Sequence, residues 1–144
     1  MNTGVLDLQP MRRAILSVED GLALLGRGDW VEAPSEALVN TLRAGVIQSF
    51  EFTYELCVKM LKRRLRLDFE SRSVVDAASF KDLIRMAGER GLISSVETWF
   101  QFRDLRNETV HTYNLAKAEQ VAAAIPAFVG EAKFLLARLE ASNE

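Results

Sequence analysis

Residues 35–67 carry the pattern that most restricts the fold, because a long helix there has two apolar rows instead of one. Each row joins residues three or four positions apart, which is helical spacing. The first row is Val39, Leu42, Val46, Ser49, Thr53, Leu56 and Met60, and the second is Ile47, Phe50, Tyr54, Cys57 and Leu61. A helix that is apolar on two sides has to bury both. The second side therefore packs either inside a four-helix core or against a partner subunit.

The other segments predict further helices and no strand. Helices are expected from about Leu6 to Leu25, from Phe80 to about Glu89, from a cap at Ser94 or Ser95 into the following residues, and from about Ala116 to Ala141 with a kink at Pro126. Residues 68–78 lack a sustained period and are expected to form a connection. We therefore predict an all-α, antiparallel four-helix-type bundle of three long and two short helices, in a single domain spanning residues 1–144.

Composition excludes several classes of protein. The chain has 18 Lys and Arg against 20 Asp and Glu, a net charge of −2, so it is not a strongly basic nonspecific nucleic-acid binder. The single Cys57 rules out an internal disulfide and a cysteine zinc cluster, and we interpret Cys57 and Met60 as core residues. Because no apolar run reaches about 18 residues and no hydrophobic leader is visible, we expect a cytoplasmic protein with no membrane partner.

Residues 103–113 hold the most chemically informative side chains, including His111, the only histidine. On a continuous helix, Asp104, Asn107 and His111 share one face, and Arg106, Thr109 and Tyr113 share the adjacent face. An imidazole can transfer a proton near neutral pH, and a guanidinium keeps its positive charge beside it. Phosphodiester cleavage without a metal needs these two groups. The imidazole acts on the 2′-hydroxyl or the leaving oxygen, and the guanidinium neutralises the phosphoryl oxygens.

Charged residues on the long helix have more than one interpretation. Lys59, Arg63 and Arg66 either complement the negative C-terminal end of the helix dipole or form a phosphate-tracking stripe toward the histidine. Gln48, Glu51 and Glu55 are expected on the solvated surface or in a buried hydrogen bond. Since no second cluster of Glu or His accompanies them, we predict no metal site and no cofactor.

Four short motifs, in this order along the chain, resemble the HEPN family. They are residues 45–56, residues 84–87 with 91–93, Trp99, and the segment from Arg106 to Tyr113. The last segment matches the family motif, in which an Arg is followed by a polar residue, three further residues and a His. Its full Arg-x4-His-x-Tyr pattern resembles the version found in HepT-like proteins, the nucleotidyltransferase substrate-binding family. The resemblance covers roughly residues 40–130.

This resemblance implies a HEPN-like bundle and a two-protein toxin–antitoxin system with a cognate minimal nucleotidyltransferase as partner. The expected catalytic residues of a metal-independent endoribonuclease are Arg106, Asn107 and His111. The resemblance further implies that the nucleotidyltransferase can place AMP on Tyr113, where it would occupy Arg106 and block the cleft. Residues expected to support the site or contact substrate are Arg103, Asp104, Trp99, Lys59 and Arg63, with Trp99 either walling the pocket or packing in the core.

Strand cleavage benefits from both an acid and a base, whereas the chain has one histidine. Two copies related by a twofold axis would supply two histidines and two arginines to one cleft, so we expect a homodimer with RNA as substrate. The alternative function is a noncatalytic subunit that presents substrate to a nucleotidyltransferase. A third hypothesis is purely structural: Arg106, Asn107 and His111 only brace the end of a helix.

Overall fold

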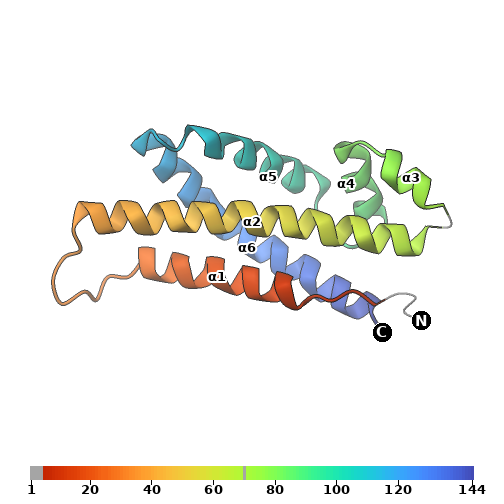
Figure 1. Ribbon diagram of the computed structural model, residues 1–144, viewed down its shortest axis with the longest axis horizontal. Coiled ribbons are helices and arrows are strands. Elements are labelled where there is room, and N and C mark those ends of the chain that lie inside the picture. Colours follow the sequence, from red (N-terminus) through yellow and green to blue (C-terminus); the bar gives the residue numbers. More distant parts are fainter. Residues whose placement is uncertain (1–4, 70) are drawn as a thin grey trace.

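The computed structural model describes residues 5–69 and 71–144 and is an antiparallel helical bundle built around one central helix (Figure 1). The central helix is α2 (Glu36–Asp68), and α1 (Gln9–Leu25) runs antiparallel to it. On other sides of α2 lie α5 (Val96–Glu108) and α6 (Leu115–Ser142), while α4 (Phe80–Glu89) covers its C-terminal end. The all-α bundle expected from the sequence is therefore confirmed.

Two details of the expected helices are wrong. Residues 68–78 are not simply a connection, because α3 (Arg72–Ala77) forms within them and buries Val75 against the bundle. The helix that carries residues 103–113 also ends earlier than a continuous helix would, at Glu108, and a 3₁₀ turn, η1 (Thr109–His111), follows it. Pro126 lies inside α6, which continues through it, and the expected kink stays a prediction.

Serine and asparagine side chains fix where the helices begin. Ser35, Ser79, Ser95 and Asn114 each precede a helix, and each side chain accepts a hydrogen bond from the backbone N–H three residues later. Each cap satisfies a donor that has no partner within the helix. Of the two serines proposed for α5, Ser95 is the cap, and Ser94 instead donates to Glu131 of α6 at 2.5 Å.

Both apolar rows of α2 are covered within the chain. Every residue of the second row is buried, and the first row is buried or half-buried. The helix achieves this because it packs against α1, α3, α4, α5 and α6. The four-helix core is thus the correct alternative of the two raised by the pattern, and the double apolar face of α2 is no longer an argument for a partner subunit.

Helix α6 is long and apolar enough to cross a membrane, yet its apolar stripe lies in the bundle core. Ile125, Phe128, Leu135 and Leu139 are fully buried among α1, α2 and α5. A helix that contributes its apolar stripe to the core of a bundle can pass the same test of length and composition as a membrane span. The amide of Asn143, just after α6, closes the bundle by pairing with both backbone groups of Leu6 at 2.9 and 3.0 Å.

An aromatic cluster fills the core beneath α5. Phe128 has ring contacts with Phe50, Tyr54, Trp99 and Phe102 at centroid distances of 4.9–6.5 Å. Burial raises the pKa of Tyr54 to about 12, although the nearby Arg103 and Arg106 charges oppose the shift. Burial also raises the pKa of the Cys57 thiol, which is fully enclosed. Both groups therefore stay protonated at neutral pH, which agrees with core packing as the role of Cys57.

The raised pKa of Tyr54 predicts a loss of stability in alkali. The unfolded chain releases this proton near pH 10.0, whereas the folded chain holds it to about pH 12, so the stabilisation is complete below pH 10 and declines above it. Between about pH 8 and about pH 11, the free energy of unfolding should fall by about 1 kcal/mol more in the parent than in Tyr54→Phe. Denaturant titrations at the two pH values measure this difference.

The matched control is Tyr113→Phe, which changes the chain's other tyrosine, one that is 87% exposed. Its stability curve should follow that of the parent. Equal alkaline losses in the parent and in Tyr54→Phe would contradict the assignment.

Candidate functional site

The candidate site lies where α5 ends and the chain turns into α6, beside the N-terminal half of α2 (Figure 1). The 3₁₀ turn at Thr109–His111 advances about 120° per residue instead of about 100°, which rotates His111 by roughly 60° from its expected direction. The two helical faces predicted for this motif are therefore wrong beyond Glu108. Thr112 donates to the carbonyl of Thr109 at 2.7 Å and closes this turn.

Arg106 is held by two carboxylates of α2. Its Nη1 lies 3.0 Å from Glu51 Oε2, and its Nη2 lies 3.3 Å from Glu55 Oε2. The Arg106 and Glu51 side chains are 28% and 29% exposed, so this pair is partly shielded from water, whereas Glu55 is 61% exposed. Glu51 and Glu55 are one turn apart on α2, and the guanidinium spans both. The interaction anchors the end of α5 to the central helix.

Thr109 completes this anchor, a role that the motif did not predict. Its hydroxyl lies 2.6 Å from Glu51 Oε2, to which it donates, and accepts from Arg106 Nη1 at 3.1 Å. Thr109 is 6% exposed. Two features of the sequence could have identified Thr109. It follows Arg106 by three residues, and the two glutamates that face it, Glu51 and Glu55, are four residues apart on α2. Of the three α2 residues expected either on the surface or in a buried hydrogen bond, Glu51 makes a part-buried hydrogen bond, whereas Gln48 and Glu55 are exposed.

The other half of the motif faces solvent. Asn107, His111 and Tyr113 are all exposed, and the His111 and Tyr113 rings meet edge to face at a centroid distance of 6.4 Å. Within residues 5–69 and 71–144, neither Asp104 nor Asn107 donates or accepts a hydrogen bond with the His111 ring. Neither residue therefore orients the imidazole through a hydrogen bond. The imidazole is nevertheless open to an incoming ligand.

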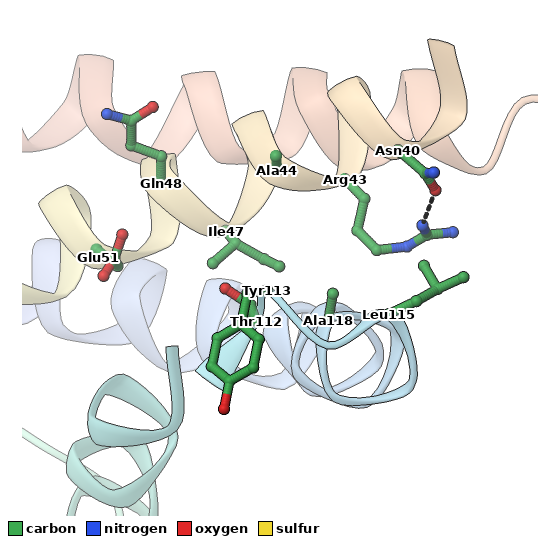
Figure 2. A pocket seen from close by; sticks show the side chains of 10 residues that line it. All are labelled: Asn40, Arg43, Ala44, Ile47, Gln48, Glu51, Thr112, Tyr113, Leu115 and Ala118. Atoms are coloured by element: carbon green, nitrogen blue, oxygen red, sulfur yellow. Dashed lines mark hydrogen bonds between the residues drawn. The ribbon is translucent and has the colours of Figure 1, made fainter. Parts of the chain in front are cut away.

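The sequence led us to expect Tyr113 on the same helix as Arg106, and this expectation is wrong. Tyr113 follows the 3₁₀ turn, lines a cleft beside α2, and extends its ring away from α2 with the hydroxyl outermost (Figure 2). The ring neighbours His111 instead of the guanidinium. Its exposure still leaves the hydroxyl accessible to a modifying enzyme.

The residues expected to support the site lie in different parts of the structure. Trp99 is fully buried in the aromatic cluster and packs in the core instead of walling a pocket. The Arg103 guanidinium lies 4.6 Å from the Phe80 ring centre, over α4, while Asp104 is exposed next to it in sequence. Neither forms a hydrogen bond or ion pair with His111 in the part of the chain that the structure describes.

The basic run on α2 leads away from the site. Lys59 and Arg63 are exposed, one and two turns beyond Glu55, about 6 and 12 Å along the axis. Arg63 lines a different cleft with the N-terminal segment, and Arg66, in the same cleft, forms an ion pair with Asp76 at 3.0 Å. The phosphate-tracking role of Lys59 and Arg63 stays a prediction.

A cleft of about 340 Å³ adjoins the motif, between α2 and the start of α6 (Figure 2). Its lining residues are Asn40, Arg43, Ala44, Ile47, Gln48, Glu51, Thr112, Tyr113, Leu115 and Ala118. Glu51 belongs both to this cleft and to the Arg106 anchor. Among the described residues, no group of three or more His, Cys, Asp or Glu side chains could hold a metal ion.

Comparisons with known proteins agree with the motif. The profile of the family described as "Nucleotidyltransferase substrate binding protein like" matches residues 6–141. A Haemophilus influenzae protein named "Probable ribonuclease HepT" is 39% identical over 144 residues, which are 100% of this chain and 99% of that protein.

Two solved structures have related folds. One from Haemophilus influenzae, described as the fold of a substrate binding domain of a nucleotidyltransferase, has a TM-score of 0.90 and 39% identity and covers 93% of this chain and 99% of its own. A crystal structure from Thermus thermophilus has a TM-score of 0.60 and 32% identity and covers 85% of this chain and 98% of its own. The chain therefore belongs to the HepT-like, nucleotidyltransferase substrate-binding protein family.

Proposed function

We propose that this protein is a metal-independent endoribonuclease, the toxin of a two-protein system with a minimal nucleotidyltransferase, acting in the cytoplasm. The observation that carries the proposal is the contrast within the motif. Arg106 is fixed to α2, while the imidazole of His111, five residues later, is exposed and makes no hydrogen bond within the described residues. The name of the Haemophilus influenzae relative supports the same activity.

The chemistry follows from these two side chains. His111 takes the proton of a ribose 2′-hydroxyl as that oxygen attacks the neighbouring phosphorus, and the P–O5′ bond breaks to leave a 2′,3′-cyclic phosphate and a 5′-hydroxyl. The departing oxygen receives a proton from an acid. Arg106 stabilises the extra negative charge on the phosphoryl oxygens at the transition state. Asn107 is exposed next to Arg106, and we assign it the contact with the ribose.

The anchor on Arg106 sets a condition for this chemistry. A substrate phosphate competes with Glu51 and Glu55 for the guanidinium, and a guanidinium has five donors in a planar fork. Glu55 is the more exposed partner and has the longer contact, so it is the one that a phosphate displaces more easily. Glu51 then keeps Arg106 in position while the outer donors bind substrate.

A homodimer supplies the second proton-transfer group. Each chain has one histidine, so a twofold pairing of exposed motifs would bring a second imidazole to serve as the acid while the first serves as the base. The exposed Val110, with 66% of its surface accessible between Arg106 and His111, is an apolar contact available to such an interface.

The direct test is RNA cleavage by the purified chain. His111→Ala should lower the cleavage rate at least about a hundredfold, because general acid–base catalysis contributes that much. Arg106→Ala should cause a loss of about the same size through reduced charge stabilisation. A fluorescent single-stranded RNA with a chelator present measures the rate and tests metal independence together. The control is Arg85→Ala, which removes an exposed arginine of α4 and should leave the rate unchanged.

Cleavage that persists unchanged in His111→Ala would end the ribonuclease proposal. Complete loss of cleavage in chelator, restored by a divalent cation, would contradict metal independence. Circular dichroism of each variant separates lost chemistry from lost folding.

We also propose that the nucleotidyltransferase partner controls the toxin by placing AMP on Tyr113. The tyrosine oxygen attacks the α-phosphorus of ATP, the bond to the β-phosphate breaks, and pyrophosphate leaves with formation of a phosphodiester. Tyr113 is accessible for this reaction because it is 87% exposed. Its ring contacts that of His111, so an attached nucleotide puts bulk and negative charge at the catalytic surface.

Mass spectrometry after incubation with the neighbouring-gene nucleotidyltransferase and ATP tests this regulation. An AMP adduct should appear on Tyr113 and be absent from Tyr113→Phe, and cleavage should fall as the adduct accumulates. Tyr54 serves as an internal control, because it is buried and should carry no adduct. Adducts confined to another residue would contradict the regulatory model.

A noncatalytic, substrate-presenting subunit is the second candidate. The family description and the Haemophilus influenzae structure favour it, and so does the occupation of Arg106 by two carboxylates. The two candidates differ in one outcome: a presenting subunit binds nucleotide or RNA without cleaving it.

A further inference from the structure

We infer that the cleft beside Tyr113 is a binding subsite for a nucleotide of the RNA chain, next to the bond that is cleaved. The inference rests on the proposed ribonuclease function and adds to it a second site at which the substrate is bound. The residues that carry it are Arg43, Gln48, Ala44 and Tyr113, none of which was assigned this role by the sequence motif.

The cleft is continuous with the catalytic surface. Glu51, which binds Arg106, forms one end of it, and Tyr113, whose ring meets that of His111, forms one side. Arg43 lies eight residues before Glu51 on α2, about 12 Å away along the helix axis. A chain bound at Arg106 and His111 therefore has a second positive group within reach of its next nucleotide.

The positive end of the cleft suits a phosphate. The Arg43 side chain is only 13% exposed and is oriented by a hydrogen bond from its Nη1 to Asn40 Oδ1 at 2.9 Å (Figure 2). Glu119 is its ion-pair partner at 4.0 Å, too long for a hydrogen bond, so most of the guanidinium donors remain available to a ligand within the described part of the chain. The N-terminal end of α6, which has no acidic residue in its first turn, lies at the rim and adds positive potential.

The remaining walls suit a nucleoside. Ile47 and Ala118 are buried and give an apolar floor, and the exposed face of Tyr113 offers a surface for stacking. The amides of Gln48 and Asn40 present donors and acceptors to the edge of a base or to a ribose. The volume of about 340 Å³ falls within the range of small-ligand pockets, roughly 300–1,000 Å³. A cation, an apolar floor and neighbouring amides in one cleft are the groups that a nucleotide requires.

Binding measured without cleavage separates this inference from the proposed function. The full-length His111→Ala protein serves as the background, and the probes are a fluorescein-labelled single-stranded RNA pentanucleotide and free AMP. Arg43→Gln should weaken pentanucleotide binding about tenfold through loss of a charge-assisted contact. Ala44→Phe, which fills the cleft from an exposed helix position and keeps every charge, should weaken it by a similar factor. Arg85→Gln removes the same charge from α4 and should bind as the background does.

Pentanucleotide affinity that is unchanged in both cleft variants would overturn the inference, even if the parent chain cleaves RNA. Loss of AMP binding with unchanged pentanucleotide binding would also overturn it, because the cleft would then serve a free mononucleotide. Weakened pentanucleotide binding in a chain that never cleaves RNA would support the subsite while the ribonuclease proposal fails. If Arg43→Gln lowers the melting temperature of the protein, Ala44→Phe alone tests the inference.

Discussion

The contact of Arg106 with Glu51 and Thr109 is the interaction on which the rest of the site depends. It joins the last turn of α5 to the middle of the central helix, in a place where both charges are only about a quarter exposed. Removing one charge would leave the other partly buried and poorly solvated, which costs more than an exposed ion pair is worth. The 3₁₀ turn that follows, and with it the direction of His111, is fixed at its first residue by Thr109.

This anchor explains how a small bundle can present the polar side chains of the motif on an open surface. A histidine on a mobile loop would lose the positioning that proton transfer needs, whereas one buried in the aromatic cluster would be closed to a nucleic acid. Here the anchored residues Arg106 and Thr109 face α2, and Asn107, His111 and Tyr113 face solvent within the same short segment. The bundle beneath them, with Phe128 at the centre of four ring contacts, supplies the rigid support.

The fold was predictable because its determinants are local. Helical spacing marked both rows of α2, and serine caps marked the starts of α4 and α5. The α3 helix was missed because six residues are too few to show a period, and because it depends on packing Val75 against the bundle. The dimer argument drawn from α2 failed for a related reason: periodicity shows that a face must be covered but not by which element.

The motif was visible in the sequence, but its geometry was not. The spacing of Arg106, His111 and Tyr113 identified the motif, yet a pattern cannot show that a helix tightens into a 3₁₀ turn, and this tightening separates Tyr113 from Arg106. The partners of Arg106 were also beyond the motif, because Glu51 and Glu55 are more than fifty residues away in sequence. Trp99 lies on the same helix as Arg106, but it is buried because α5 directs its ring toward Phe128.

The most direct test of this account is a double-mutant cycle on the free energy of unfolding with Glu51→Gln, Arg106→Gln and the combined variant. If the two side chains form the anchor seen here, the single losses should not add, and the coupling energy should be about 1 kcal/mol. Losses that add to within about 0.3 kcal/mol would show that the two residues act independently and would contradict the central claim.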